Sequence, residues 1–186
     1  MAQLVYTAIT SLDGYVADAS GHFDWAAPDA EVHAFVNDLV RPVGTYLCGR
    51  KLYETMVYWE THPTADPDGS VEDDFAGIWQ AADKVVYSTT LDRASSRRTT
   101  IEGVFAPDAV GALALAAERE VSIGGPHLAA HALRAGLVDE IRLFRAPVVV
   151  GGGTAALPNG IRLDLTLHEN RRFVGGTTYA RYAVAR

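Results

Sequence analysis

The sequence contains a single cysteine and no apolar run long enough to cross a membrane. Cys48 therefore cannot form a disulfide within the chain, and its apolar neighbours predict a buried thiol in a strand. A spanning helix needs about 18 consecutive apolar residues, and the N-terminus lacks the basic and apolar segments of a secretion signal. We therefore expect a soluble cytoplasmic protein with no membrane partner.

Clustered positive charge is also scarce. The chain has 16 basic and 23 acidic residues, and its net charge of −7 argues against a nucleic-acid partner. The densest basic cluster is Arg93, Arg97 and Arg98, in a predicted loop. This cluster is either a solvated turn or a contact for a cofactor phosphate.

Metal-site spacing is absent as well. The one histidine pair at HxxxH spacing, His127 and His131, has no acidic neighbour or evident third ligand, so we expect no metal. With 186 residues, 48% of them hydrophobic, the chain is predicted to form a single domain over residues 1–186. Such a domain buries roughly 70% of its unfolded surface.

The hydrophobic periodicity predicts alternating strands and helices. The expected strands are 3–9, 45–48, 84–87, 121–123 and 139–145, and the expected helices are 28–40, 51–57, 109–120 and 126–135. The helix over 28–40 is predicted to carry Pro28 in its first turn, and residues 62–74, rich in Pro, Asp and Gly, are predicted to form a loop.

After Pro147 the pattern changes. Residues 163–167 and 179–184 alternate with a period of two and have no helix between them, which predicts an antiparallel hairpin. The expected fold class is therefore α/β, with a mostly parallel central sheet, helices on both faces and a C-terminal antiparallel hairpin.

Two strand-to-helix junctions carry glycine, at residues 49–51 and 124–127. A helix start at the carboxyl end of a strand presents free N–H groups to an anion, and glycine permits close approach of a phosphate. Taken singly, each junction is also compatible with a plain turn. Two of them in one small sheet favour a phosphate ligand.

Arg50 adds a fixed charge and a planar donor fork to the first junction, and Ser88 and Thr89 add hydroxyls after the next strand. This combination suits a 2′-phosphate and predicts a preference for NADPH over NADH. The alternative is that Arg50 pairs with a surface carboxylate while the two hydroxyl residues only end a strand.

Several of these segments together resemble the dihydrofolate-reductase-like superfamily. The segments are TSLDGY at 10–15, GRKLYE at 49–54, ST at 88–89, IGG at 123–125, and GLVDE at 136–140 followed by PVV at 147–149. The resemblance is greatest to the reductase domain, the C-terminal one, of the bifunctional riboflavin-pathway deaminase/reductase and to its stand-alone relatives. It runs from about residue 3 to the C-terminus in the family's order, and it implies a dihydrofolate-reductase-like fold and a possible homodimer.

The resemblance also implies an NADPH site with four parts. Ala8 and Ile9 would line the nicotinamide pocket, Gly49, Arg50 and Lys51 the adenosine side, Ser88 and Thr89 the 2′-phosphate, and Gly124, Gly125, Pro126, His127 and Leu128 the pyrophosphate. Asp13 and Gly14 would border the substrate cleft.

The sequence departs from the family at the acidic residue that anchors a pterin in dihydrofolate reductases. Asp29 and Glu31 are the candidates, and Glu31 has the better helical relation to Phe35, four residues on. A solvated helix carboxylate is the alternative for Glu31. The candidate catalytic residues are therefore Asp13 and Glu31, and folate reduction is not implied.

Three functions follow. The leading hypothesis is an NADPH-dependent oxidoreductase that reduces a small planar heterocycle, pterin-like or pyrimidine-like. The first alternative is the riboflavin-pathway reduction of a ribosylaminopyrimidine phosphate, against which we set the absence of a deaminase domain with His and Cys zinc ligands in these 186 residues. The second alternative is a non-catalytic, dimeric NADPH-binding module.

Overall fold

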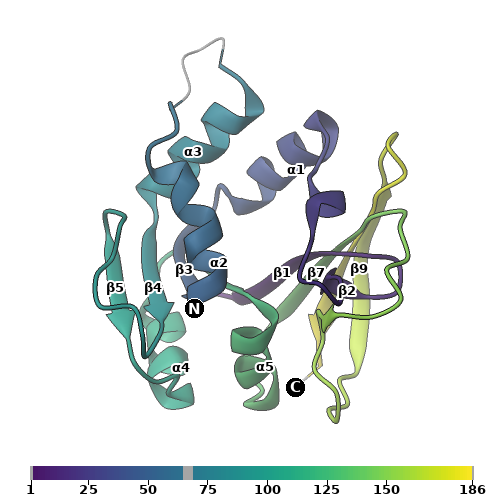
Figure 1. The fold of residues 1–186 in the computed structure, drawn as a ribbon. Helices are drawn as coiled ribbons and strands as arrows, with labels where there is room; N and C mark the ends of the chain where they lie inside the picture. Colours follow the sequence, from purple (N-terminus) through teal and green to yellow (C-terminus); the bar gives the residue numbers. More distant parts are fainter. Residues whose placement is uncertain (1, 65–68, 186) are drawn as a thin grey trace.

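One large sheet organises the part of the chain that the computed structural model describes, residues 2–64 and 69–185. Its eight strands lie in the order β5-β4-β3-β6-β1-β7-β10-β9 (Figure 1). They are β1 (Leu4–Thr10), β3 (Val43–Gly49), β4 (Asp83–Tyr87), β5 (Thr99–Glu102), β6 (Glu120–Gly124), β7 (Glu140–Arg145), β9 (Leu165–Arg172) and β10 (Thr178–Val184). The short strands β2 (Tyr15–Ala17) and β8 (Thr154–Ala155) pair separately.

The six strands from β5 to β7 are parallel, and β10 and β9 continue the sheet in antiparallel fashion. The central strand β1 is largely buried because it lies between β6 and β7 with helices above and below. The predicted α/β class and the C-terminal hairpin are both confirmed. All six parallel strands have their carboxyl ends at the same edge of the sheet.

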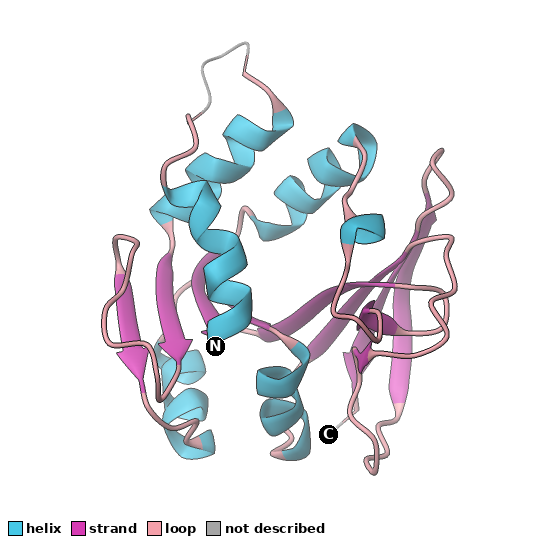
Figure 2. Cartoon of the chain, in the orientation of Figure 1, coloured by secondary structure: helices cyan, strands magenta, loops and turns pink. Residues whose placement is uncertain are grey.

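Helices cover both faces (Figure 2). One face carries α1 (Ala30–Val40), α2 (Arg50–Met56) and α3 (Val71–Ala81), with the 3₁₀ turns η1 (Asp24–Ala26) and η2 (Val57–Glu60) nearby; the other carries α4 (Pro107–Ala116) and α5 (Pro126–Arg134). Trp79 of α3 is fully buried against Tyr46 and Val86, and Ala129 of α5 packs with Leu47 on the opposite face.

The starts of α1 and α3 differ from the prediction. Helix α1 begins at Ala30 because the Asp29 carboxylate caps it, accepting the Val32 N–H at 2.9 Å, so Pro28 precedes the cap and is not in the first turn. The predicted loop over 62–74 is wrong at its end, where α3 starts at Val71. Residues 65–68 of that loop lie outside the described residues.

A capping box explains the start of α3. Ser70 Oγ accepts the Asp73 N–H, and the Asp73 carboxylate accepts the Ser70 N–H. The acidic first turn that resembles a loop in the sequence therefore stabilises a helix N-terminus. Helix α4 is also displaced from the predicted 109–120, since it starts at Pro107 and its expected last residue, Glu120, already begins β6.

Within the described segments, no helix combines the length and apolar content needed to cross a lipid bilayer.

Candidate functional site

The two glycine junctions meet where neighbouring strands send their helices to opposite faces. Cys48 of β3 pairs with Gly124 of β6, while α2 packs on one face of the sheet and α5 on the other. A Cβ built on Gly125 would lie 3.9 Å from the Gly49 nitrogen. Both turns therefore lie at one edge, at the type of position where open α/β sheets bind ligands.

The second turn favours glycine at both positions, for different reasons. Gly125 has a φ of +87°, which favours glycine, and a Cβ on Gly124 would overlap the Leu52 side chain of α2. Helix α2 therefore packs directly onto the turn that precedes α5. Pro126 follows at the first helical position, where the missing N–H costs no hydrogen bond.

A hollow of about 370 Å³ opens beside these turns. Its lining residues come from the ends of β3 and β4, the segment after β5, and α5: Gly49, Arg50, Tyr87, Ser88, Thr89, Thr90, Gly103, Phe105, His127, Leu128 and His131. Six of the twelve residues expected at a cofactor are among them: Gly49, Arg50, Ser88, Thr89, His127 and Leu128.

One part of the hollow is polar. Arg50 is half exposed, and its one ion pair within the described part of the chain is an exposed 3.4 Å contact with Glu54, so its guanidinium is free to reorient toward a ligand. Ser88 Oγ accepts the N–H groups of Thr90 and Leu91 at 3.2 and 3.0 Å, which fixes its side chain at the end of β4. Arginine and hydroxyl groups together provide donors for a phosphate.

The other part is aromatic. Phe105 stacks on His131 with ring centroids 5.7 Å apart, and Tyr87 contacts Phe105 at 5.4 Å. Sequence reasoning did not place these residues in the site. Phe105 follows β5, which the periodicity missed, whereas His131 could have been found because it lies one helical turn after His127.

The remaining expected cofactor residues lie outside this hollow. Lys51 is exposed on α2, and Gly124, Gly125 and Pro126 form the adjoining turn. Ala8 and Ile9 lie in β1, two strands from β3, where they pair with Leu143 and Phe144 of β7. Their contact with a nicotinamide stays a prediction.

The two carboxylates expected at the substrate bind backbone amides. Asp13 accepts N–H bonds from Val150 at 3.2 Å and Gly151 at 2.7 Å. A hydrogen bond from the Ser11 side chain, together with these amides, lowers the pKa of Asp13 below its usual range. Glu31 accepts the Val174 N–H at 2.9 Å, beside the β9–β10 turn. Neither lines the 370 Å³ hollow, and their contact with a substrate stays a prediction.

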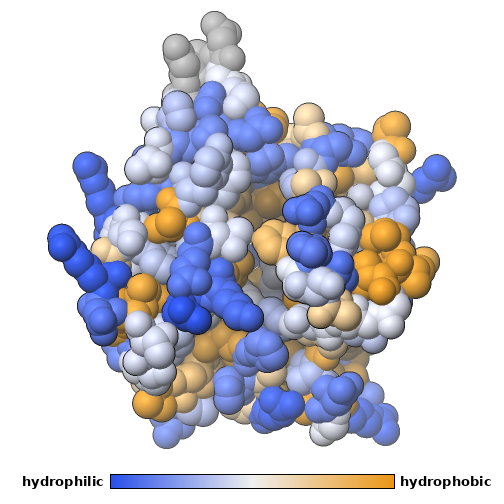
Figure 3. Space-filling view, viewed as in Figure 1, coloured by the Kyte–Doolittle hydropathy of each residue, from blue (hydrophilic) through white to orange (hydrophobic). Residues whose placement is uncertain are grey.

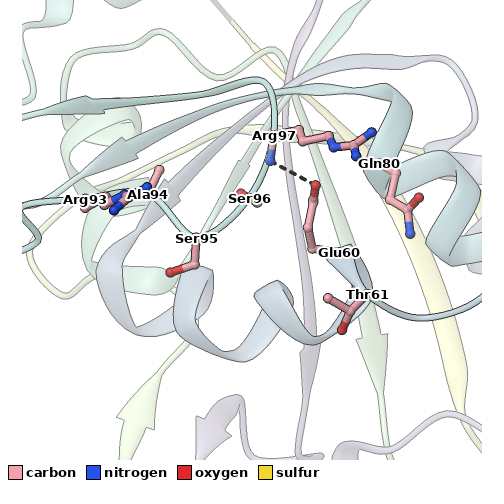
Figure 4. A pocket seen from close by; sticks show the side chains of 8 residues that line it. All are labelled: Glu60, Thr61, Gln80, Arg93, Ala94, Ser95, Ser96 and Arg97. Atoms are coloured by element: carbon pink, nitrogen blue, oxygen red, sulfur yellow. Dashed lines mark hydrogen bonds between the residues drawn. The ribbon is translucent and has the colours of Figure 1, made fainter.

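A larger hollow, of about 760 Å³, lies beside η2 and the end of α3 (Figure 4). Its lining residues are Glu60, Thr61, Gln80, Arg93, Ala94, Ser95, Ser96 and Arg97, and it shares none with the first hollow. The basic cluster is divided, because Arg93 and Arg97 line this space while Arg98 pairs with Asp83 at 2.9 Å.

Glu60 occupies part of this larger space. Its Oε1 accepts the Arg97 N–H at 2.9 Å, and its Oε2 lies 3.7 Å from the buried Lys84 ammonium. The carboxylate is therefore already bonded within the protein, while Arg93 and Arg97 add positive charge to the lining. In the described ranges, no group of three or more His, Cys, Asp or Glu side chains could hold a metal ion.

Comparison with known proteins agrees with this architecture. The RibD C-terminal domain family matches residues 2–179. The chain belongs to this family. The resemblance to the riboflavin-pathway reductase domain is thereby confirmed, and the chain is a reductase-like RibD C-terminal domain.

Individual relatives of this RibD C-terminal domain are distant in sequence. YyaP, an uncharacterised protein of Bacillus subtilis (strain 168), is 24% identical over 182 residues, which cover 97% of this chain and 94% of YyaP. A Shewanella sp. PV-4 protein assigned to riboflavin biosynthesis is similar over the whole of both chains, with a TM-score of 0.75 and 22% identity.

A second solved structure links the fold to dihydrofolate reductases. Enterococcus faecalis dihydrofolate reductase, in complex with NADP(H) and RAB-propyl, is similar with a TM-score of 0.67 and 14% identity, over 99% of this chain and 97% of the reductase. At this identity the similarity shows the fold. The expected dihydrofolate-reductase-like fold is confirmed.

Proposed function

We propose that this RibD C-terminal domain is an NADPH-dependent reductase of a small planar heterocycle, pterin-like or pyrimidine-like. The observation that carries the proposal is the 370 Å³ hollow, which collects the end of β3, the end of β4 and the start of α5 at one edge of the sheet. These segments are far apart in the sequence, and each supplies groups suited to one part of a dinucleotide.

The residues fit NADPH by their chemistry. Arg50, Ser88 and Thr89 offer charge-assisted and hydroxyl donors to a 2′-phosphate, which NADH lacks. The nine-residue helix α5 would direct its first amides toward the pyrophosphate, and Gly125, whose φ of +87° favours glycine, shapes the turn that precedes them. Phe105 and His131 offer stacking surfaces to adenine.

When bound, the cofactor supplies the hydride. The chain's own task is to hold the cofactor across the sheet edge, orient its reactive ring and exclude water. The Enterococcus faecalis dihydrofolate reductase, in its complex with NADP(H), supports this assignment because it has the same fold.

The riboflavin-pathway alternative has specific support. The family is defined by the C-terminal domain of RibD, and the Shewanella protein is assigned to riboflavin biosynthesis. Reduction of a ribosylaminopyrimidine phosphate is therefore the second candidate function. Following the absorbance of reduced nicotinamide over a panel of pterins, pyrimidines and quinones distinguishes these substrates. Binding of NADPH without oxidation by any of them would favour the non-catalytic module.

Isothermal titration of NADPH and NADH tests the cofactor assignment. We expect tight binding of NADPH and much weaker binding of NADH. The Arg50→Ala variant should lose about 1.5–3 kcal/mol of NADPH affinity, roughly 10- to 150-fold, and little NADH affinity, since a charge-assisted contact is removed. Equal affinity of the wild-type protein for the two cofactors would refute the 2′-phosphate assignment.

Arg93→Ala is the matched control, because Arg93 is also exposed but lines the other hollow. We expect its NADPH affinity to remain within about twofold of wild type. The proposed site is wrong if Arg93→Ala loses the preference for NADPH over NADH while Arg50→Ala keeps it. The 2′-phosphate would then bind the basic cluster of Arg93, Arg97 and Arg98.

A further inference from the structure

The Asp13 carboxylate joins two segments that are 135 or more residues apart. It follows β1, and its two oxygens accept the backbone N–H groups of Val150 and Gly151, which follow β7. Because the acceptors are both oxygens of one carboxylate, the bonds hold the two segments in one relative position. We call Asp13 with these two amides the latch.

The latch is the exposed end of a longer connection between the same segments. Leu12 donates its N–H to the Val148 carbonyl at 2.7 Å, and Ala156 donates to the Gly14 carbonyl at 2.9 Å. Beyond them β2 and β8 pair, with Tyr15 opposite Ala155. The turn after β1 and the segment after β7 therefore form one ribbon, attached to the sheet at the carboxyl ends of neighbouring strands.

The strand order places this ribbon at the far end of a dinucleotide. This step rests on the proposed function. The polar and aromatic hollow lies at β4 and β3, the glycine turns at β3 and β6, and the next strands along the edge are β1 and β7. From β4 to β1 there are three strand intervals, about 14 Å at the usual strand spacing. A cofactor with its phosphates at the glycine turns therefore brings its nicotinamide to the ends of β1 and β7.

The surface agrees with this placement. Figure 3 shows a hollow near the middle of this face, between the part formed by α2 and α3 and the part formed by β2 and its adjoining loops. Leu12 and Val149, on the two latched segments, are 62% and 66% exposed. Exposed apolar side chains suit contact with a flat ring.

We propose that Asp13 is a positioning residue, which latches the segment after β7 to the turn after β1 and thereby shapes the nicotinamide end of the cofactor site. Both of its oxygens accept backbone N–H groups, which gives the carboxylate a structural task at this turn. The latch acts on the nicotinamide end and leaves the adenosine end, three strands away, unchanged.

The Asp13→Asn variant tests the latch with NADP⁺ and 2′,5′-ADP as probes. Asparagine keeps the shape but turns an NH₂ group toward one of the two backbone donors, so one bond is lost. We expect the dissociation constant of NADP⁺ to rise about tenfold. That of 2′,5′-ADP, which lacks the nicotinamide half, should stay within about twofold.

Asp18→Asn is the control, because Asp18 also accepts two backbone N–H groups, from Ser20 and His22, but within its own turn. It should leave both dissociation constants unchanged. Hydrogen exchange supplies a second readout, in which Val150 and Gly151 amides exchange faster in Asp13→Asn than in wild type or Asp18→Asn. Asp13→Glu, which keeps the charge, should restore part of the NADP⁺ affinity.

The outcomes separate the two proposals. Wild-type protein that binds neither probe would overturn the proposed function, and with it the nicotinamide placement. Wild-type protein that binds both probes, with Asp13→Asn weakening both equally or neither, would overturn the latch and leave the proposed function standing. If Asp13→Asn does not fold, Asp13→Glu with unchanged NADP⁺ affinity and unprotected amides at 150 and 151 overturns the latch.

Discussion

At the scale of single residues, Cys48 lies next to the candidate site in sequence, but its side chain takes no part in that site. It is the residue before Gly49, yet its side chain is fully buried in the core between β3 and the helices of one face. Burial raises the pKa of the Cys48 thiol to about 12, from an ordinary value of 9.0, although the Lys84 charge partly opposes the shift. The thiol is therefore protonated and inert in the native protein.

This shift predicts a pH-dependent stability. The folded pKa is raised, so the stabilisation is complete below pH 9 and is lost as the pH rises toward 12, because the unfolded chain releases the proton first. We expect the free energy of unfolding to fall by about 1.4 kcal/mol between pH 8 and 10 owing to this group. Urea unfolding across this range measures the fall.

Cys48→Ala provides the comparison, since it removes the titrating group. Its unfolding free energy should depend less on pH over the same range. Ellman's reagent should also leave native wild-type protein unlabelled at pH 8 and label it after unfolding. Rapid labelling of the native protein would show that the thiol is accessible and that the assigned burial is wrong.

At the scale of elements, Gly153 controls whether the ribbon of β2 and β8 can form. Its φ is +134°, and a Cβ there would overlap the Ala17 carbonyl and the backbone of Asp18. Backbone atoms cannot move aside as a flexible side chain can. The glycine therefore allows the segment after β7 to approach the segment after β1.

Gly153→Ala should consequently destabilise the protein by more than Gly160→Ala. Gly160 also has a positive φ, of +75°, but a Cβ there meets open space. The Gly160→Ala substitution should therefore lower stability only through the backbone conformation, by about 1–2 kcal/mol. We expect Gly153→Ala to lower the free energy of unfolding by at least about 1 kcal/mol more than Gly160→Ala does. It should also expose the amides at 150 and 151 to hydrogen exchange. Equal unfolding free energies for the two variants would contradict the close approach.

Elements buried on both faces could be predicted from sequence. β1 and β3 have largely apolar sequences because helices cover them above and below, and periodicity detects such runs. β7 was also predicted, although Glu140 and Arg142 within it are charged and buried. Strand β5 was missed because an edge strand of four residues with half its side chains exposed carries no such run. β2 and β8 depend on contacts between distant segments, which no local pattern contains.

The candidate site, like the fold, could be predicted only in part from the sequence. Glycine, arginine and hydroxyl residues at strand ends carry a local signal, and the structure brings four of them, Gly49, Arg50, Ser88 and Thr89, to one hollow. Phe105 lacked that signal because its place depends on β5. The engagement of Asp13 with Val150 could not be predicted either, since nothing near Asp13 in sequence specifies a partner 137 residues away.

At the scale of the whole molecule, the sheet divides into two functional regions. The parallel strands from β4 to β7 present their carboxyl ends to the proposed cofactor, while β10 and β9 extend the sheet away from it. Strand β9 is an exposed edge with Leu165 and Leu167 on its surface, a feature that proteins usually cover or protect. The homodimer that the family resemblance implies stays a prediction.

The central claim is that one dinucleotide lies along this edge, with its phosphates at the glycine turns. A crystal structure of the protein with NADPH tests it most directly. We predict the 2′-phosphate beside Arg50 and Ser88, the pyrophosphate at Gly124 and Gly125, and the nicotinamide at the ends of β1 and β7. Electron density for the cofactor in the hollow lined by Arg93 and Arg97, with the glycine turns unoccupied, would contradict the account.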